Sequence, residues 1–292
     1  MRILEWLKAV LYGILEGVTE WLPVSSTGHL ILLADCLPFQ FCTDAEFLDA
    51  FGEMFEVIIQ LGAICAVLLL FWGRLCPFSK QKTSDEKTHT WRLWGKVLLA
   101  SLPAAVAGIL ADRALLAWTG RDVDGWLFCA PVVAFSLVFY GVIFLFFKKP
   151  GQGRLPKTEQ ADAVTPLQAL GVGAFQMLAL VPGTSRSGAT VLGAELLGLS
   201  RKAGAEFSFF MAIPIMLGAS AVKAMDFFAY VTRSDVSIPA DAWIVLAVGC
   251  ATSFAVSTVA IRFLLDFVKR HSFVPFGVYR IALGLSILFL RW

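Results

Sequence analysis

The amino-acid sequence predicts an all-α polytopic membrane protein with six transmembrane helices and two re-entrant helical hairpins in an inverted repeat. Of its 292 residues, 58% are hydrophobic and only 16% are charged, whereas a soluble domain usually carries about 25% charged residues. Several apolar segments are long enough to cross a bilayer, and two further apolar stretches are interrupted by proline, glycine and polar residues. No long polar stretch divides the chain, so we expect a single integral membrane domain over residues 1–292. A net charge of +2 gives no indication of nucleic-acid binding.

A helix that crosses a bilayer needs about 20 mostly apolar residues. Six segments meet this requirement: residues 54–72, 93–111, 126–147, 205–222, 242–261 and 274–290. The stretches 4–35 and 165–200 do not, because proline and glycine break each of them in the middle. Proline removes a backbone donor and clashes with the preceding turn, so each stretch should split into two half-helices. Irregular backbone at membrane depth must be shielded by protein or face a cavity, which favours re-entrant hairpins.

The charges of the connecting loops predict the orientation. Loops 73–92, 148–164 and 262–273 are rich in lysine and arginine, and by the positive-inside rule they are cytoplasmic. Segment 36–53 holds four carboxylates and no lysine or arginine, and it is assigned to the outside together with loops 112–125 and 223–241. The sides alternate correctly across six spans only if both broken stretches return to the side on which they began. Both termini are then outside.

The two broken stretches also resemble each other. Gly13-Ile-Leu-Glu16 leads to Pro23-Val-Ser-Ser-Thr-Gly28, and Gly173-Ala-Phe-Gln176 leads to Pro182-Gly-Thr-Ser185. Each is followed by three spans, an odd number, so the halves, about 1–147 and 165–292, must be inverted in the membrane. Inverted repeats with broken helices place a shared site near the bilayer midplane. We therefore expect the tips of the two hairpins to meet there.

The first polar cluster offers carboxylates, hydroxyls and an imidazole. Glu16 and Glu20 are four residues apart and share a helix face, where they are tolerable if one is protonated or if a cation such as Mg²⁺ or Ca²⁺ lies between them. Alternatively, one glutamate bonds to backbone and the other reaches an interface. The hydroxyls of residues 25–27 are candidates for helix capping or for a catalytic or ligand role. His29 follows Ser26 by three residues, which lets its imidazole approach the serine hydroxyl or the ligand.

The second polar cluster surrounds Arg186 with hydroxyls and glycines at the start of a half-helix. A guanidinium stays charged and matches phosphate oxygens in a bidentate manner, and a helix N-terminus favours an anion. Alternatively, Arg186 pairs with Glu195 or Glu206 across the bundle. The run Pro182-Gly-Thr-Ser-Arg-Ser-Gly188 lacks the spacing of a P-loop, which argues against nucleotide hydrolysis. Face to face, the two clusters predict a site for a phosphorylated substrate.

The motifs EGVTEWLPVSSTGH (Glu16 to His29) and PGTSRSGAT (Pro182 to Thr190) resemble the two signatures of the bacterial undecaprenyl-pyrophosphate phosphatases, the bacitracin-resistance family. FEVIIQLGAI (Phe55 to Ile64), AEFSFFMAIPIMLGA (Ala205 to Ala219) and SFVPFGVYR (Ser272 to Arg280) are also similar to that family. The resemblance runs from about residue 10 to the end of the chain. It implies hydrolysis of a C55 prenyl pyrophosphate to the monophosphate and inorganic phosphate in the bacterial inner membrane. That reaction recycles the carrier lipid for peptidoglycan synthesis and confers bacitracin resistance.

The resemblance also implies a divalent cation, Mg²⁺ or Ca²⁺, held by Glu16 and Glu20, and a homodimer is a possible assembly. The catalytic residues it implies are Glu16, Glu20, Ser26, His29 and Arg186; the substrate-binding candidates are Ser25, Thr27, Gly183, Ser185, Ser187, Gly188 and Thr190.

Two routes for phosphoryl transfer stay open. Either Ser26 attacks the terminal phosphorus with Glu20 or His29 taking its proton, or water attacks directly and Ser26 is only a ligand. A histidine nucleophile of the SRxxxxxHxxxD type is disfavoured, because Leu192 and Leu196 stand where that pattern needs His and Asp. The competing function is a polyprenyl-phosphate carrier or flippase that uses the same anion site without cutting the lipid.

Overall fold

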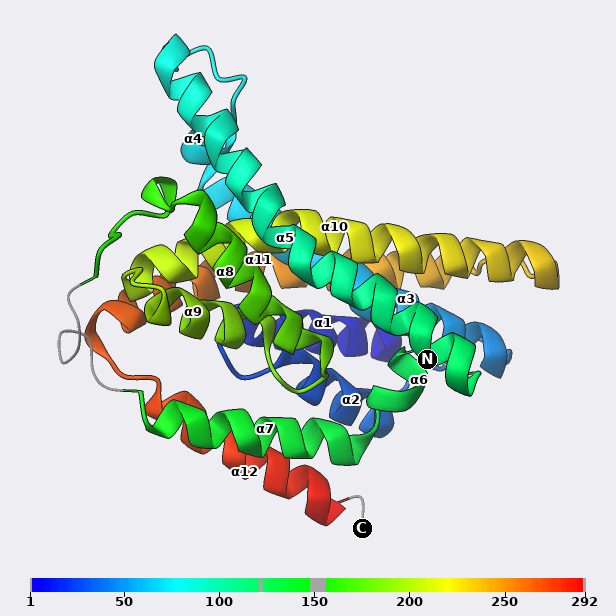
Figure 1. Cartoon of the computed structure of the whole chain (residues 1–292). Coiled ribbons are helices and arrows are strands. Elements are labelled where there is room, and N and C mark those ends of the chain that lie inside the picture. Colours follow the sequence, from blue (N-terminus) through cyan, green and yellow to red (C-terminus); the bar gives the residue numbers. More distant parts are fainter. Residues whose placement is uncertain (1, 121–122, 148–155, 291–292) are drawn as a thin grey trace.

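The computed structural model describes residues 2–120, 123–147 and 156–290, and the described chain is helical with no β-strand (Figure 1). The first half contains α1 (Arg2–Thr19), α2 (Ser26–Cys36), α3 (Ala45–Leu70), α4 (Trp72–Leu75), α5 (Ser84–Thr119), α6 (Val123–Leu127) and α7 (Ala130–Leu145). The second contains the 3-10 turn η1 (Ala161–Ala163), α8 (Pro166–Gln176), the 3-10 turn η2 (Met177–Leu180), α9 (Arg186–Leu196), α10 (Arg201–Ser234), α11 (Ala240–Arg270) and α12 (Val274–Leu290).

Four described helices, α3, α5, α10 and α11, are long and apolar enough to cross a membrane, and α7, α8 with η2, and α12 are shorter apolar helices. The chain is therefore a multi-pass helical membrane protein. The long helices extend beyond the predicted spans because polar caps begin them early: Asp44 accepts a hydrogen bond from the Phe47 N–H, and Thr83 and Glu86 form a capping box. Part of the predicted basic loop 148–164 lies outside the described residues.

Both apolar stretches that the sequence marked as broken are broken in the structure. The first break, residues 20–25, separates α1 from α2, and the second break, residues 181–185, separates η2 from α9. Each ends on a serine with an unusual backbone: Ser25 has φ 72° and ψ 102°, and Ser185 has φ 72° and ψ 112°. A positive φ is rare outside glycine and is typical of strained functional segments. The two breaks thus share a conformation as well as a sequence pattern.

Helices of the first half pack against helices of the second half. α1 lies against α11, α8 lies against α5, and α7 runs beside α12 along one side of the molecule (Figure 1). The first two crossings are close, because a Cβ atom at Gly13 would collide with the carbonyl oxygen of Gly249, and one at Gly173 would collide with that of Ala100. Matching glycines of the two broken stretches therefore allow matching helix crossings.

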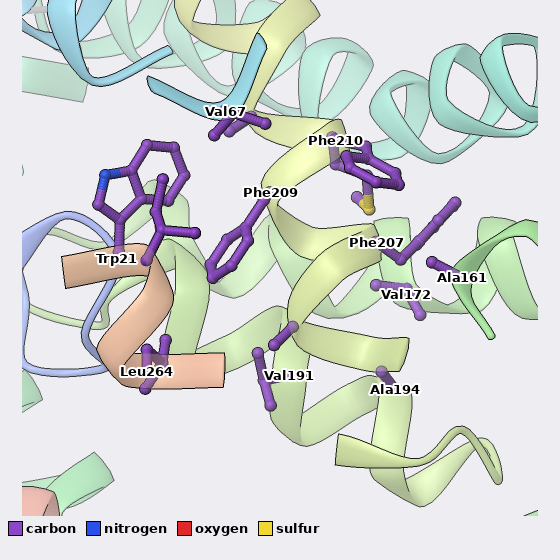
Figure 2. Packing of buried hydrophobic residues seen from close by; sticks show 14 of the residues in the cluster. Trp21, Val67, Ala161, Val172, Val191, Ala194, Phe207, Phe209, Phe210 and Leu264 are labelled. Carbon is purple, nitrogen blue, oxygen red and sulfur yellow. The ribbon is translucent and has the colours of Figure 1, made fainter. Parts of the chain in front are cut away.

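A buried apolar cluster packs the first break and α9 against α10. Trp21 of the first break is fully buried and meets the Phe209 ring edge-on, with centroids 5.0 Å apart (Figure 2). Val191 of α9 belongs to the same cluster, as does Phe210 of α10 (Figure 2). Aromatic pairs of this kind contribute about 0.5–1.5 kcal/mol beyond their buried area. The cluster therefore supports the irregular backbone of the first break and the helix that follows the second.

Candidate active site

A cavity of about 160 Å³ lies between the two breaks, with its remaining wall formed by α3 and α10. Both signature motifs contribute to it. From the first come Glu20, Ser25, Ser26 and Thr27; from the second come Gly183, Ser185 and Arg186; and Gln60 and Met216 close it from α3 and α10. The structure therefore brings most of the predicted site residues to one place from opposite halves of the chain.

Glu20 is the centre of the polar network. Its Oε2 atom accepts a hydrogen bond of 2.7 Å from the Ser26 hydroxyl. Its Oε1 atom accepts from Nη2 and Nε of Arg186, at 3.1 and 3.3 Å. Only 7% of the Glu20 side chain and 11% of the Arg186 side chain are exposed, so this ion pair is largely shielded from solvent. Ser26, Glu20 and Arg186 form one continuous chain of hydrogen bonds along the cavity.

Arg186 has further partners that fix its direction. Its Nη1 atom donates to the Ser208 carbonyl at 2.8 Å, and its Cζ atom lies 5.7 Å from the centre of the Trp21 ring. The partners considered from sequence lie elsewhere: Glu195 pairs with Arg201, and Glu206 pairs with Arg74 and Lys202. The guanidinium is thus aimed at the cavity and at Glu20 rather than across the bundle.

The remaining hydroxyls of the second signature brace the start of α9. Ser185 caps the helix, accepting from the Gly188 N–H at 3.2 Å, and its hydroxyl bonds to that of Ser187. The Ser187 hydroxyl also donates to the Leu22 carbonyl at 3.3 Å, which links the second signature to the first break. Thr190 bonds to the Arg186 carbonyl and to the Ser208 hydroxyl. Ser187, Gly188 and Thr190 lie behind the cavity wall, so their contacts shape the site from outside.

His29 does not face Ser26. Its Nδ1 atom is 2.7 Å from the Ser25 carbonyl, which can only accept, so Nδ1 carries the proton of that bond. Its Nε2 atom lies 2.6 Å from the Tyr279 hydroxyl on α12. Both ring nitrogens are therefore engaged, and the group that contacts the Ser26 hydroxyl is Glu20. Of the two candidate bases considered from sequence, the geometry favours the carboxylate.

Glu16 is fully buried, and both of its carboxylate oxygens have no hydrogen-bond partner. It lies one helical turn before Glu20 but does not line the cavity. Within the described residues there is no group of three or more His, Cys, Asp or Glu side chains that could hold a metal ion. A divalent cation bound through one or two carboxylates and completed by substrate phosphates needs no such group. Of the two glutamates, Glu16 has both carboxylate oxygens without a hydrogen-bond partner, whereas both oxygens of Glu20 accept hydrogen bonds from Ser26 and Arg186.

Comparison with known proteins identifies the family of this chain. The family model described as bacitracin resistance protein BacA matches residues 9–286. The chain belongs to the BacA family. It is 44% identical over 289 residues to an undecaprenyl-diphosphatase of Streptococcus mutans, covering 99% of this chain and 97% of that protein. It is 45% identical over 285 residues to an undecaprenyl-diphosphatase of Enterococcus faecalis, covering 98% of this chain and 96% of that protein.

Sequence reasoning missed several residues that shape the site of this BacA-family chain. Trp21, Ser208 and Tyr279 contact Arg186 or His29 directly, yet none carries a charge that would mark it in the sequence as a site residue. Arg280 bonds to the backbone of both breaks. A signal for it was present, because an arginine inside a membrane segment is costly and is a functional candidate by default.

Proposed function

We propose that this chain hydrolyses undecaprenyl pyrophosphate to undecaprenyl phosphate and inorganic phosphate in the cavity between the two breaks. The observation that carries the proposal is the hydrogen-bonded chain of Ser26, Glu20 and Arg186 along that cavity. It joins a nucleophile, a base and a phosphate-binding guanidinium within one site. The activity that the relatives' names state agrees with it. By removing the pyrophosphate, the reaction recycles the carrier for cell-wall synthesis and confers bacitracin resistance.

In the proposed binding mode, the terminal phosphate lies at Arg186 and at the backbone of Gly183 and Ser185, which line the cavity. The Nε and Nη2 donors that meet Glu20 can turn to phosphate oxygens, while the bond from Nη1 to the Ser208 carbonyl keeps the guanidinium in place. Donors that are already oriented stabilise the charge that develops on the transferred phosphoryl group. The α9 N-terminus adds the favourable end of its dipole.

Chemistry proceeds in two steps. The Ser26 oxygen attacks the terminal phosphorus while Glu20 Oε2 takes the hydroxyl proton; the Ser–O–P bond forms, the bond to the bridging oxygen breaks, and undecaprenyl phosphate leaves. Water then attacks the phosphoserine, the Ser–O–P bond breaks, Glu20 returns its proton to the Ser26 oxygen, and the water's oxygen and protons leave with inorganic phosphate. In the alternative route water attacks the substrate directly and Ser26 only binds it. The 2.7 Å contact between Ser26 and Glu20 favours the first route.

We assign the cation, Mg²⁺ or Ca²⁺, to Glu16 and Glu20. The unpartnered oxygens of buried Glu16 support this assignment. When bound, the cation would neutralise charge on the pyrophosphate and on the departing phosphate.

The membrane arrangement that we propose has six spans, α3, α5, α7, α10, α11 and α12, with α1–α2 and α8–α9 as re-entrant hairpins of an inverted repeat in the bacterial inner membrane. The first helix of each hairpin packs against a span of the other half, α1 on α11 and α8 on α5, and this correspondence supports the repeat. The matching φ angles of Ser25 and Ser185 support it as well. Both termini are then on the outer side.

The prenyl chain needs an apolar path away from the cavity. A groove of about 390 Å³ runs along α7 beside the second break and is lined by Val132, Phe135, Phe139 and Val181, among others. Val181 also lines the catalytic cavity, so the two spaces are neighbours. We place the first isoprene units of the substrate in this groove.

The test is inorganic phosphate release from undecaprenyl pyrophosphate in detergent, with and without EDTA, for the wild type, Arg186→Ala and the exposed control Arg233→Ala. Loss of one preorganised donor group costs about 10²–10³-fold in kcat, so Arg186→Ala should fall by at least that much and Arg233→Ala should not. No release by folded wild-type protein would favour the carrier function, which needs the anion site but no nucleophile.

The nucleophile is tested by rapid quench with substrate labelled in the terminal phosphate. Label should appear on wild-type protein and be absent from Ser26→Ala. Turnover by the wild type without labelled protein at any quench time would favour direct attack by water.

A further inference from the structure

Arg280 of α12 is the most deeply buried cation among the described residues, with no exposed surface. Its Nη2 atom donates to the Gly183 carbonyl at 2.7 Å, and its Nη1 atom donates to the Pro23 carbonyl at 3.2 Å. In the part of the chain that the structure describes, no carboxylate forms an ion pair with it, and its Nε atom has no partner. A buried charge without a counter-ion is costly, so its retention needs a reason.

The two carbonyls that Arg280 contacts lie in the two different breaks. Pro23 stands two residues before Ser25, and Gly183 stands two residues before Ser185, so they hold equivalent places in the two repeats. Two residues after each of these carbonyls stands a serine with a positive φ. One guanidinium therefore connects the same point of both breaks, close to the start of α2 and of α9.

We propose that Arg280 is a positioning residue that sets the distance between the two breaks, and hence between Ser26 and the phosphate-binding Arg186. It acts through backbone, because Arg280 does not line the cavity. The inference rests on the roles of Ser26 and Arg186 given under the proposed function. Since those two residues belong to opposite halves of the chain, covalent connection along the sequence does little to fix their separation.

The surroundings of Arg280 suit this role. Its Cζ atom lies 5.4 Å from the centre of the Phe144 ring and 5.9 Å from that of Tyr140, both on α7, and such rings favour a guanidinium over a strongly hydrated ammonium. The planar group holds its two donors at a fixed spacing, which a lysine cannot reproduce. The preceding residue, Tyr279, bonds to His29, which in turn bonds to the Ser25 carbonyl. Two consecutive residues of α12 thus hold the first break.

The test compares Arg280→Met and Arg280→Lys with the wild type, measuring kcat and KM for phosphate release together with thermal stability in detergent. A misplacement of about 1 Å between reacting groups costs on the order of 10²-fold. We expect Arg280→Met to lose about that much in kcat while KM stays near the wild-type value. Arg280→Lys should recover part of kcat, because it keeps the charge and one donor direction.

Arg201→Met is the matched control. Arg201 is also buried, lies 5.0 Å from the Phe273 ring and bonds to Glu195, but none of these contacts is with a break. It should lower stability and leave kcat of the folded protein near the wild-type value. A folded Arg280→Met or Arg280→Lys protein with wild-type kcat would overturn the proposal, as would a kcat loss that Arg201→Met shows to the same extent. If Arg280→Met does not fold, kcat of Arg280→Lys and of Arg280→Gln is compared with that of the wild type and of Arg201→Met, and the same outcomes support or overturn the proposal.

Ser26→Ala, measured in the same series, separates this inference from the proposed function. Wild-type turnover by Ser26→Ala would refute the proposed nucleophile whatever Arg280 does. An inactive Ser26→Ala beside a fully active Arg280→Met would refute only the positioning role.

Discussion

Replacing Glu20 with glutamine changes the proposed base with little change in shape. The amide oxygen can still accept from Arg186, but the amide nitrogen that replaces Oε2 can only donate, so the Ser26 hydroxyl loses the acceptor it has at 2.7 Å. A positioned general base contributes about 10²–10⁴-fold to the rate, equivalent to about 3–5 kcal/mol in the barrier. We expect kcat to fall within that range.

The effect on folding should be smaller than the effect on catalysis. Breaking a buried ion pair by deleting one partner costs about 3–5 kcal/mol, but glutamine keeps a hydrogen bond to Arg186. The guanidinium also keeps its 2.8 Å bond to the Ser208 carbonyl. A loss of about 1–3 kcal/mol in the free energy of unfolding follows, which is typical of weakening one charged hydrogen bond. A thermal melt in detergent measures it.

The assay is phosphate release at saturating substrate for Glu20→Gln, Ser26→Ala and the double variant. Glu195→Gln is the matched control, because Glu195 also pairs with a buried arginine, Arg201, but lies away from the cavity. If Glu20 acts through Ser26, the double variant should be no slower than Ser26→Ala alone, since residues that act as a unit are not additive. A Glu20→Gln protein within about tenfold of wild-type kcat, or losses that multiply in the double variant, would refute the reasoning.

Three other predictions follow from the structure. Gly183 has φ +88°, and a Cβ there would lie 2.6 Å from the Val133 carbonyl oxygen, so Gly183→Ala should lower the free energy of unfolding by at least about 1–3 kcal/mol and reduce activity. The control Gly218→Ala, in open space on a helix, should raise the free energy of unfolding by about 0.5–1 kcal/mol. Thermal melts of both variants check this. EDTA should abolish phosphate release, Mg²⁺ or Ca²⁺ should restore it, and Glu16→Gln should raise the cation concentration needed for half-maximal activity. Val132→Trp should fill the groove and lower kcat/KM for undecaprenyl pyrophosphate by about 10-fold or more. It should hardly change kcat/KM for dimethylallyl pyrophosphate, whose prenyl chain is short. The control Val142→Trp, at an exposed position on the same helix, should change kcat/KM for neither substrate.

Each of these would be contradicted by a simple result. A Gly183→Ala protein as stable and active as the wild type would show that the second break is not held as described. Full activity after exhaustive chelation would remove the cation from the proposal, and equal losses on both substrates would place the prenyl chain elsewhere.

The positions of the long helices could be predicted from sequence, because a run of apolar residues marks the middle of each one. The breaks at residues 20–25 and 181–185 were also predictable, because Pro23 and Pro182 lie among polar residues inside apolar stretches. The ends of the long helices were not, since their polar turns carry no apolar signal and depend on caps such as Asp44. The α7 span was predicted from residue 126, but Cys129 is extended there and α7 begins at Ala130.

The meeting of the two signatures was predicted from the repeat, and Glu20, Ser26 and Arg186 do lie together. Side-chain directions could not be predicted, because they depend on neighbours distant in sequence. His29 lies three residues after Ser26, yet Tyr279 of α12 binds its Nε2 atom and holds the ring elsewhere. For Arg186 the sequence suggested Glu206 of α10 as a partner, but the contact that α10 makes is through the backbone carbonyl of Ser208, two residues further along that helix.

In the proposed mechanism the ion pair of Glu20 and Arg186 has different uses before and after substrate binds. Without substrate, each ion compensates the other in an apolar site, where a lone charge would be costly. An entering phosphate competes with Glu20 Oε1 for Nε and Nη2 of Arg186, while the bond from Nη1 to the Ser208 carbonyl does not depend on Glu20. Arg186 can therefore change partner without moving away, while Glu20 keeps its Oε2 contact with Ser26 and its Oε1 atom is released. Activation of the nucleophile is in this way tied to the presence of the phosphate that it attacks.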